Sequence, residues 1–340
     1  MDPDALDGVE RAVHAGTADP DLLDFTATVN PTRPSGVAAV YDSALAASHR
    51  YPADDYAAFR AAAADYVGCP AEGVVPAAGG LAGVRLAFDV ALEPDDSALV
   101  PSPSFDEYAR EVRMRGATPE FVPHDDLLDA DPAGHALAVV ATPNNPTGDA
   151  ADAADLRAFA DRCRDAGTLF VVDETFLDFA DRPSMAGTEG VAVARSLGTT
   201  FGLPGLRAGF LVAAGRLRDR LETARPAWGL STPAALVGEH CLGETGFVAD
   251  SRDRVRSERD RLRVALEPAY GVGPSEAPFL LLDTRERDPA AVVRHARDRG
   301  VVVRDATTFR GLDGHVRVAV GRPDDNDRLL RALPGLDPRT

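Results

Sequence analysis

Short apolar runs alternate with helix-like stretches along most of the chain, and this alternation constrains the fold more than any other feature. Five runs are apolar on both faces, at residues 97–100, 137–141, 169–172, 191–194 and 210–213. Strands of this kind are typical of a buried parallel sheet that helices cover on both sides. We therefore expect an α/β fold whose large domain has a mostly parallel central sheet.

The C-terminal third predicts a smaller α+β domain. Residues 251–266 form a long charged stretch with Val255, Leu262 and Leu266 on one side, as in an amphipathic helix. Apolar runs at 279–282, 301–303 and 316–320 alternate with helical stretches at 290–299 and 326–333. We expect an N-terminal segment (1–40) that joins the small domain, a large cofactor domain (41–235) and a small C-terminal domain (236–340).

The charge balance excludes several classes of partner. The chain has 340 residues, with 54 acidic against 36 basic side chains and a net charge of −18. Such a surface repels nucleic-acid phosphates, so no nucleic-acid partner is expected. No apolar run reaches membrane-spanning length and no secretory signal is visible, which predicts a cytoplasmic protein without a membrane partner. The three cysteines form no Cys-x-x-Cys pair, and no metal is expected.

All 36 basic residues are arginine, and the chain contains no lysine. Arginine can replace lysine on a solvated face, and an acidic, arginine-using composition is typical of a halophilic protein. Arginine cannot replace a lysine that must act as an amine. The composition therefore excludes lysine Schiff-base chemistry by this chain alone.

Three stretches place polar side chains where ligands bind in α/β proteins. Asp173 directly follows the run at 169–172, at a predicted carboxyl end of a strand. The stretch 143–148, Pro-Asn-Asn-Pro-Thr-Gly, predicts a rigid loop that presents amide groups. Arg207 lies in a glycine-bounded turn at 203–209 that suits a phosphate. Each signal is weak alone, and a structural turn or cap explains each at least as well.

Taken together, these stretches resemble the fold-type I pyridoxal-phosphate (PLP) enzymes of the aminotransferase superfamily. The closest resemblance is to the L-threonine-O-3-phosphate decarboxylases of cobalamin biosynthesis, and the histidinol-phosphate aminotransferases are near relatives. The resemblance covers residues 22–333 and is carried by 23–31, 50–56, 142–148, 173–179, 195–207 and 301–320. It implies a PLP-dependent lyase or aminotransferase that acts on an amino-acid phosphate.

The resemblance also implies a role for each position of the cofactor site. Asp173 would pair with the pyridine nitrogen, Asn145 with the ring hydroxyl, and Phe105 would stack on the ring. The phosphate would meet the backbone of Gly79 and Gly80 at a helix N-terminus and the side chains of Ser196 and Arg207. Tyr51 would reach the phosphate of the other subunit, which implies a homodimer.

Three further positions correspond to substrate-binding residues of the family. Arg317 would bind the substrate carboxylate, Arg304 would meet the substrate phosphate, and Asn30 would lie beside the substrate. Phe105, Tyr51 and Arg304 also have ordinary readings, as a core residue, a turn residue and a rim ion pair.

The chain departs from the family pattern where the cofactor is anchored. Thr199 occupies the position of the Schiff-base lysine, and Gly198 that of a phosphate-binding hydroxyl residue. Ala78 and Leu81 replace polar residues of the phosphate cup. The N-terminal His-Gly-Gly motif of the decarboxylases is expected near residues 4–7, where no histidine stands.

Three hypotheses follow. The first is a weakly active decarboxylase that uses non-covalent PLP. The second is a pseudoenzyme, a non-catalytic paralogue that binds a ligand or forms a heterodimer with a lysine-bearing homologue. The third is a changed chemistry that uses pyridoxamine phosphate. Loss of lysine removes a nucleophile and a proton carrier, and general acid–base catalysis alone contributes about 10²–10⁴-fold.

Overall fold

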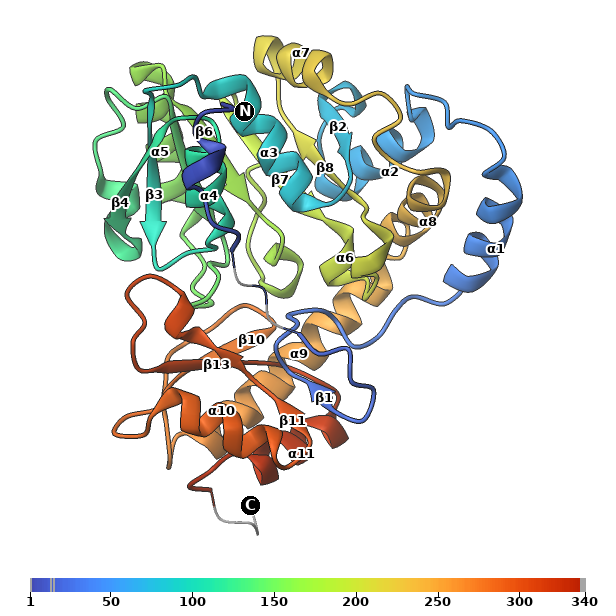
Figure 1. Cartoon of the computed structure of the whole chain (residues 1–340). Helices are drawn as coiled ribbons and strands as arrows, with labels where there is room; N and C mark the ends of the chain where they lie inside the picture. Colours follow the sequence, from blue (N-terminus) through green and yellow to red (C-terminus); the bar gives the residue numbers. More distant parts are fainter. Residues whose placement is uncertain (1, 13, 15, 337–340) are drawn as a thin grey trace.

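The structure is a computed structural model, and it describes residues 2–12, 14 and 16–336 (Figure 1). A central sheet has the strand order β2-β8-β7-β6-β5-β3-β4. The strands from β3 to β7 run parallel to one another, which confirms the expected α/β fold with a mostly parallel sheet. The seven strands span Val74–Ala77 (β2), Ser97–Ser102 (β3), Thr118–Pro123 (β4), Leu137–Ala141 (β5), Leu169–Asp173 (β6), Val191–Ser196 (β7) and Gly209–Val212 (β8).

Strand β8 runs antiparallel to both of its neighbours, so the expectation that 210–213 is a parallel strand was wrong. The link from β7 to β8 holds only the four-residue helix α6 (Leu197–Thr200) and one 3-10 turn. A parallel return needs a crossover of a dozen or more residues, usually with a full helix, so this short link reverses the chain instead. The sequence analysis did not predict strands β2 and β4, because each contains proline and neither is a clear apolar run.

Helices cover both faces of the central sheet and form two apolar cores. One core contains residues of α2, α5 and α8, and the other contains residues of α3, α4 and α7. The helices of this part are α1 (Val37–Ala47), α2 (Ala57–Val67), α3 (Gly80–Ala91), α4 (Glu107–Arg113), α5 (Ala153–Ala166), α7 (Gly215–Ala224) and α8 (Thr232–Leu242). Because both faces are buried, the strands carry apolar side chains on both sides.

A smaller part lies below the central sheet in Figure 1. Its antiparallel sheet has the order β12-β13-β10-β9, and a separate pair joins β1 to β11. The strands are β1 (Leu23–Asp24), β9 (Gly271–Val272), β10 (Phe279–Asp283), β11 (Val301–Val302), β12 (Arg304–Asp305) and β13 (His315–Ala319). The helices are α9 (Thr245–Leu266), α10 (Pro289–Arg297) and α11 (Pro323–Ala332). Pairing of β1 with β11 brings the N-terminal segment against this part.

Helix α9 connects the two parts. Val248 near its start belongs to a core of the central sheet, whereas Val255, Leu262 and Leu266 belong to the core of the smaller part. The expected division between residues 235 and 236 falls inside α8, which packs against α1 and α2 of the larger part. Short 3-10 turns occur at Leu6–Gly8, Ala71–Gly73, His124–Asp129, Leu177–Phe179, Pro204–Leu206 and Ala306–Thr308.

Among the helices that the structure describes, none has both the length and the apolar character that a membrane span requires.

Candidate functional site

Asp173 ends strand β6 and is held by neutral donors. Its Oδ2 accepts a hydrogen bond from the hydroxyl of Tyr108 at 2.7 Å, and its Oδ1 accepts from the backbone N–H and the hydroxyl of Thr175 at 3.0 and 2.5 Å. The residue is 8% exposed, and no arginine or histidine of the described residues forms an ion pair with it. A buried carboxylate without a cationic partner is costly, so this one is suited to a cationic group of a ligand.

Arg207 lines the same pocket as Asp173. Its φ of 56° is left-handed, a conformation that costs a non-glycine residue about 1–2 kcal/mol. The guanidinium donates to the carbonyl oxygens of Pro204 at 3.1 Å and Ala78 at 3.2 Å. Strained residues concentrate at functional sites, where the surrounding structure holds them in place.

Gly79 and Gly80 begin helix α3 beside Arg207. A Cβ on Gly79 would lie 2.7 Å from Nη2 of Arg207, and one on Gly80 would lie 3.0 Å from the hydroxyl of Thr175. No side chain caps the start of this helix. The first backbone N–H groups of α3 are therefore available, next to a guanidinium, for an anion.

These groups line one pocket of about 270 Å³. It contains six of the residues that the sequence selected for the cofactor, namely Gly80, Phe105, Asn145, Asp173, Ser196 and Arg207. Gly79 lies directly behind it, against Arg207. Leu81 also lines the pocket. The sequence therefore selected residues that the fold brings together from five separate stretches of the chain.

Thr199 lies on α6 and is 9% exposed. Its backbone carbonyl accepts a hydrogen bond from the backbone N–H of Asn30 at 2.9 Å. The neighbouring Gly198 is tightly packed, since a Cβ there would lie 2.8 Å from the Cα of Pro204. A serine at residue 198 would therefore require the backbone of the 203–204 turn to move.

A second pocket, of about 170 Å³, lies next to the first and shares Thr28, Phe105 and Asn145 with it. The smaller part of the molecule contributes Arg304, Phe309 and Arg317 to this second pocket. The two arginines pair directly across strands β12 and β13. Like charges opposite each other destabilise a sheet, and an anion bound between them would offset the repulsion.

Both arginines are buried, and the contacts of Arg317 are with neutral groups. Arg317 donates to the amide oxygen of Asn145 and to the carbonyl of Thr26 at 3.1 Å, while its Nε has no acceptor among the described residues. Burial and the charge of Arg304 lower the pKa of Arg317. No carboxylate of the described residues pairs with it, so the pocket has the electrostatics of an anion site.

Asn145 contacts the arginine pair through its side chain. Its amide oxygen accepts a hydrogen bond from Arg317, and its role toward a ring hydroxyl, which the amide NH₂ would serve, stays a prediction. Because Asn145 lines both pockets, this contact connects the first pocket to the arginine pair.

Two selected residues lie away from both pockets. Asn30 is 3% exposed and fully engaged, donating to the carbonyl of Thr200 and to Ser251 and accepting from Arg254. These contacts connect the N-terminal segment to α6 and α9, and the substrate-binding role of Asn30 stays a prediction. Tyr51 is 78% exposed and stacks on Trp228, with 4.6 Å between the ring centroids.

The sequence analysis did not select Tyr108, Thr175 or His14. His14 lines the second pocket and contacts Glu107 at 3.0 Å. The N-terminal segment thus brings a histidine to the second pocket at residue 14, outside the 4–7 stretch that the sequence analysis considered. Tyr108 and Thr175 were missed because a lone hydroxyl residue carries no sequence signal.

One group with metal-ligand chemistry occurs among the described residues, outside both pockets. Ligand atoms of His124, Asp125 and Asp149 lie within 4.8 Å of one another. Asp125 is exposed, and burial lowers the pKa of His124. Exposed acidic groups are common without a metal, and nothing else at this position indicates an ion.

Comparisons with known proteins agree with this geometry. Residues 21–333 match the family model of the class I and II aminotransferases. Histidinol-phosphate aminotransferase 1 of Archaeoglobus fulgidus is 30% identical over 320 residues, which cover 92% of this chain and 98% of that protein. Threonine-phosphate decarboxylase of Salmonella typhimurium is 30% identical over 345 residues, which cover 95% and 93%. The solved structure of histidinol-phosphate aminotransferase from Sinorhizobium meliloti in complex with pyridoxal-5'-phosphate aligns with a TM-score of 0.80 at 20% identity, over 92% of this chain and 90% of that one.

Proposed function

Because the chain belongs to the class I and II aminotransferase family, we propose that its first pocket binds PLP or pyridoxamine phosphate without a covalent bond to the protein. The observation that carries this proposal is the buried carboxylate of Asp173, which lacks a cationic partner among the described residues. A protonated pyridine nitrogen is such a partner, and the N–H groups at the start of α3 with Arg207 suit a phosphate. When bound, this cofactor supplies an electron sink for a reaction at the substrate carbon.

The chain's own residues would hold the ring and exclude water. Phe105 offers an apolar face, and Tyr108 packs edge-on against it at 5.6 Å between the centroids. Tyr108 and Thr175 fix the carboxylate of Asp173 through the hydrogen bonds described above. The residues fit the cofactor as a non-covalent ligand. They do not fit a covalent attachment, because the chain has no lysine, and the family resemblance assigns the attachment position to Thr199.

The second pocket supports an amino-acid phosphate as substrate. Arg304, Arg317 and His14 offer cationic or hydrogen-bonding groups for two anionic ends, a carboxylate and a phosphate. The relatives named above include a histidinol-phosphate aminotransferase and a threonine-phosphate decarboxylase. We assign the chain to the decarboxylase type, of cobalamin biosynthesis, on the sequence stretches 23–31 and 173–179.

We further infer that turnover is weak or lost. A threonine hydroxyl is a poor base at neutral pH, so Thr199 cannot carry the proton that the family's lysine carries. His14 lines the second pocket, where its ring contacts Glu107. It does not line the first pocket, where the family's lysine would act.

Calorimetric titration of the purified chain with PLP and with pyridoxamine phosphate, in buffer rich in KCl, tests the proposal. We expect micromolar binding that Arg207→Ala removes and that Arg328→Gln, a change at an exposed arginine far along the sequence, leaves intact. Pyridoxal, which lacks the phosphate, serves as the matched ligand and should bind at least about tenfold more weakly. Absence of binding by either phosphorylated form would overturn the proposal.

A second function, as the non-catalytic partner of a lysine-bearing homologue, is favoured by one observation. Tyr51 and Trp228 form a stacked aromatic pair that is 78% and 50% exposed, on the surface of the larger part. Exposed aromatic pairs are typical of interaction surfaces. Co-expression with a lysine-bearing homologue and light scattering of the purified product would detect a heterodimer, and Tyr51→Ala should weaken it. Dimerisation, a salt-rich environment and a cytoplasmic location remain predictions from the sequence.

A further inference from the structure

A third pocket, of about 190 Å³, lies along α4 and is lined by four arginines. These are Arg11 of the N-terminal segment, Arg110 and Arg113 at α4, and Arg310 of the loop after η6 (Ala306–Thr308). The chain as a whole carries a net charge of −18, so a group of four arginines around one cavity departs from the general surface.

Two of these arginines, Arg113 and Arg310, stack on the ring of Phe121 on β4. The guanidinium carbon of Arg310 lies 4.0 Å from the centroid of its ring, and that of Arg113 lies 5.7 Å from it. Stacking on an aromatic ring holds a guanidinium in place and leaves its N–H groups free. Neither side chain has a hydrogen bond or ion pair to an acceptor anywhere in residues 2–12, 14 and 16–336, and the same holds for Arg11.

Arg110 is only partly neutralised by its own helix. Its Nη1 contacts Glu107 at 3.1 Å and Glu111 at 3.4 Å. Its Nε is buried and has no acceptor within the described part of the chain. A buried donor without a partner costs about 1–3 kcal/mol, so an acceptor at this point would be stabilising.

The acidic residues of the pocket do not cancel this charge. Glu10 and Asp106 are the two carboxylates that line it, against four guanidinium groups. Burial raises the pKa of Asp106. The charges of Arg304 and His14, which both face the second pocket, act to lower that pKa. Asp106 therefore interacts with the neighbouring pocket as well, and Arg11, Arg113 and Arg310 retain an excess of positive charge.

We infer that this arginine pocket binds a small oxyanion of the phosphate class, at a site distinct from the two pockets of the proposed function. Guanidinium groups bind phosphate oxygens through paired N–H donors, and Arg113 and Arg310 are held in place for such contacts by Phe121. A water molecule occupies about 30 Å³ of liquid, so the cavity has room for a phosphate or a pyrophosphate. Asp106 is its only residue in common with the second pocket, and Arg207, Arg304 and Arg317 are not part of it.

Titration calorimetry of the full chain, without cofactor, tests this site with inorganic phosphate and inorganic pyrophosphate as probes. We expect pyrophosphate to bind, and the double variant Arg113→Gln/Arg310→Gln to weaken that binding by at least about tenfold. The exposed Arg328→Gln is the matched control for loss of charge. The affinity of the unaltered chain should also fall more steeply than that of the double variant between about 0.2 M and about 1 M KCl.

Variants of the other pockets separate this site from the proposed function. Arg207→Ala and Arg317→Met should leave a pyrophosphate site of unchanged affinity, because neither residue lines the arginine pocket. Binding that only these two variants remove would overturn the inference, as would a double variant that binds like the unaltered chain. If the double variant fails to fold, the single changes Arg113→Gln and Arg310→Gln give the same comparison, each with a smaller loss of affinity. Failure to bind PLP would not bear on this site.

Discussion

The hydroxyl of Tyr108 donates a hydrogen bond to Oδ2 of Asp173 at 2.7 Å, and both side chains are buried. The tyrosine reaches the carboxylate from α4, whereas Asp173 ends β6. Burial and the neighbouring carboxylate raise the pKa of Tyr108 well above its ordinary value. Tyr108 thus keeps its proton at neutral pH and donates it to the hydrogen bond with Asp173.

Replacing the two members of this pair one at a time should have different effects: the change at Tyr108 should lower stability, and the change at Asp173 should weaken cofactor binding. Tyr108→Phe removes a hydrogen bond to a charged group, so we expect the free energy of unfolding in urea to fall by about 1.5–3 kcal/mol. Asp173→Asn removes the charge, so we expect at least about tenfold weaker binding of PLP in a folded chain. Equal affinity of Asp173→Asn and the unaltered chain would show that this carboxylate does not contact the cofactor.

Arg317→Met should increase stability and decrease ligand binding at the same time. Arg317 is a buried cation that pairs with no carboxylate of the described residues and lies opposite Arg304 in the sheet. Even buried ion pairs can be replaced by apolar side chains of similar volume with a gain in stability of about 1–4 kcal/mol, and a buried charge without a counter-ion is more costly still. We expect a higher melting temperature without ligand and at least about tenfold weaker binding of O-phosphothreonine by calorimetry. A less stable variant would contradict the account of this pocket.

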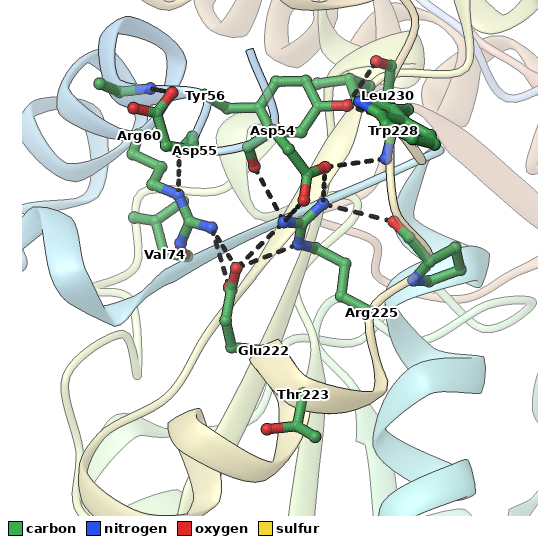
Figure 2. Close-up of polar contacts among 12 residues, drawn as sticks. Asp54, Asp55, Tyr56, Arg60, Val74, Glu222, Thr223, Arg225, Trp228 and Leu230 are labelled. Carbon is green, nitrogen blue, oxygen red and sulfur yellow. Dashed lines mark hydrogen bonds and ion pairs between the residues drawn. The ribbon is translucent and has the colours of Figure 1, made fainter. Parts of the chain in front are cut away.

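Arg225 forms several contacts with Asp54, three residues after Tyr51 in the sequence (Figure 2). Its guanidinium contacts both carboxylate oxygens of Asp54, at 3.0 and 3.1 Å, and Glu222 at 3.1 Å. Asp54 also accepts a hydrogen bond from the backbone of Trp228 at 2.8 Å. These contacts fix the 51–56 segment next to the loop that carries Trp228.

Arg225→Gln should therefore loosen the stacked aromatic pair. Trp228 is the only tryptophan of the chain, so its fluorescence reports on this one place. We expect greater quenching by acrylamide and a loss of about 1–3 kcal/mol in the free energy of unfolding. Arg216→Gln, at an exposed arginine of α7, the helix that ends just before Arg225, is the control and should change neither quantity.

Glu222 should make stability depend on pH in a defined direction. Burial would raise the pKa of this carboxyl, but hydrogen bonds and charges from Arg60 and Arg225 outweigh burial, and the pKa lies below its ordinary value of 4.5. A carboxyl with a lowered pKa stabilises the folded state above its ordinary pKa, and this contribution is lost as the pH falls through the lowered value. The difference in unfolding free energy between the unaltered chain and Glu222→Gln should therefore be greatest near neutral pH and shrink below about pH 4. Glu189→Gln, an exposed acidic residue, should show a smaller and flatter difference.

Thr199→Lys tests whether the pocket still accepts the family's attachment. The unaltered chain has no amine other than its N-terminus, so borohydride reduction with PLP can fix the cofactor only there. In the variant, we expect mass spectrometry to locate one added cofactor on the peptide that contains residue 199. Gly198 should be left unchanged, because its Cβ position lies 2.8 Å from Pro204. A variant that folds and binds PLP but gains no adduct at 199 would contradict the assigned position.

The sequence predicted the parts of the molecule that depend on local pattern. The buried strands at 137–141 and 169–172 were found because their apolar runs are long and uninterrupted, and Asp173 was found because it ends one of them. The family resemblance placed Gly80, Ser196 and Arg207 at one pocket although they come from distant stretches.

Other features depend on contacts that no local pattern encodes. The antiparallel direction of β8 follows from the shortness of its link to β7. The partner of Asn145 is an arginine of the smaller part, 172 residues away, and Asn30 is occupied by groups of α9 and α6. A polar side chain that satisfies buried donors looks the same in sequence as one that binds a ligand. Only the three-dimensional partners distinguish the two.

Helix α9 gives the molecule a property that neither part would have alone. Its 22 residues pass without interruption from a core of the central sheet to the core of the smaller part. Helix formation is cooperative, so melting either end removes packing from the other. The two cores should therefore lose structure in a single transition, and amide exchange along α9 should report one common protection level rather than two.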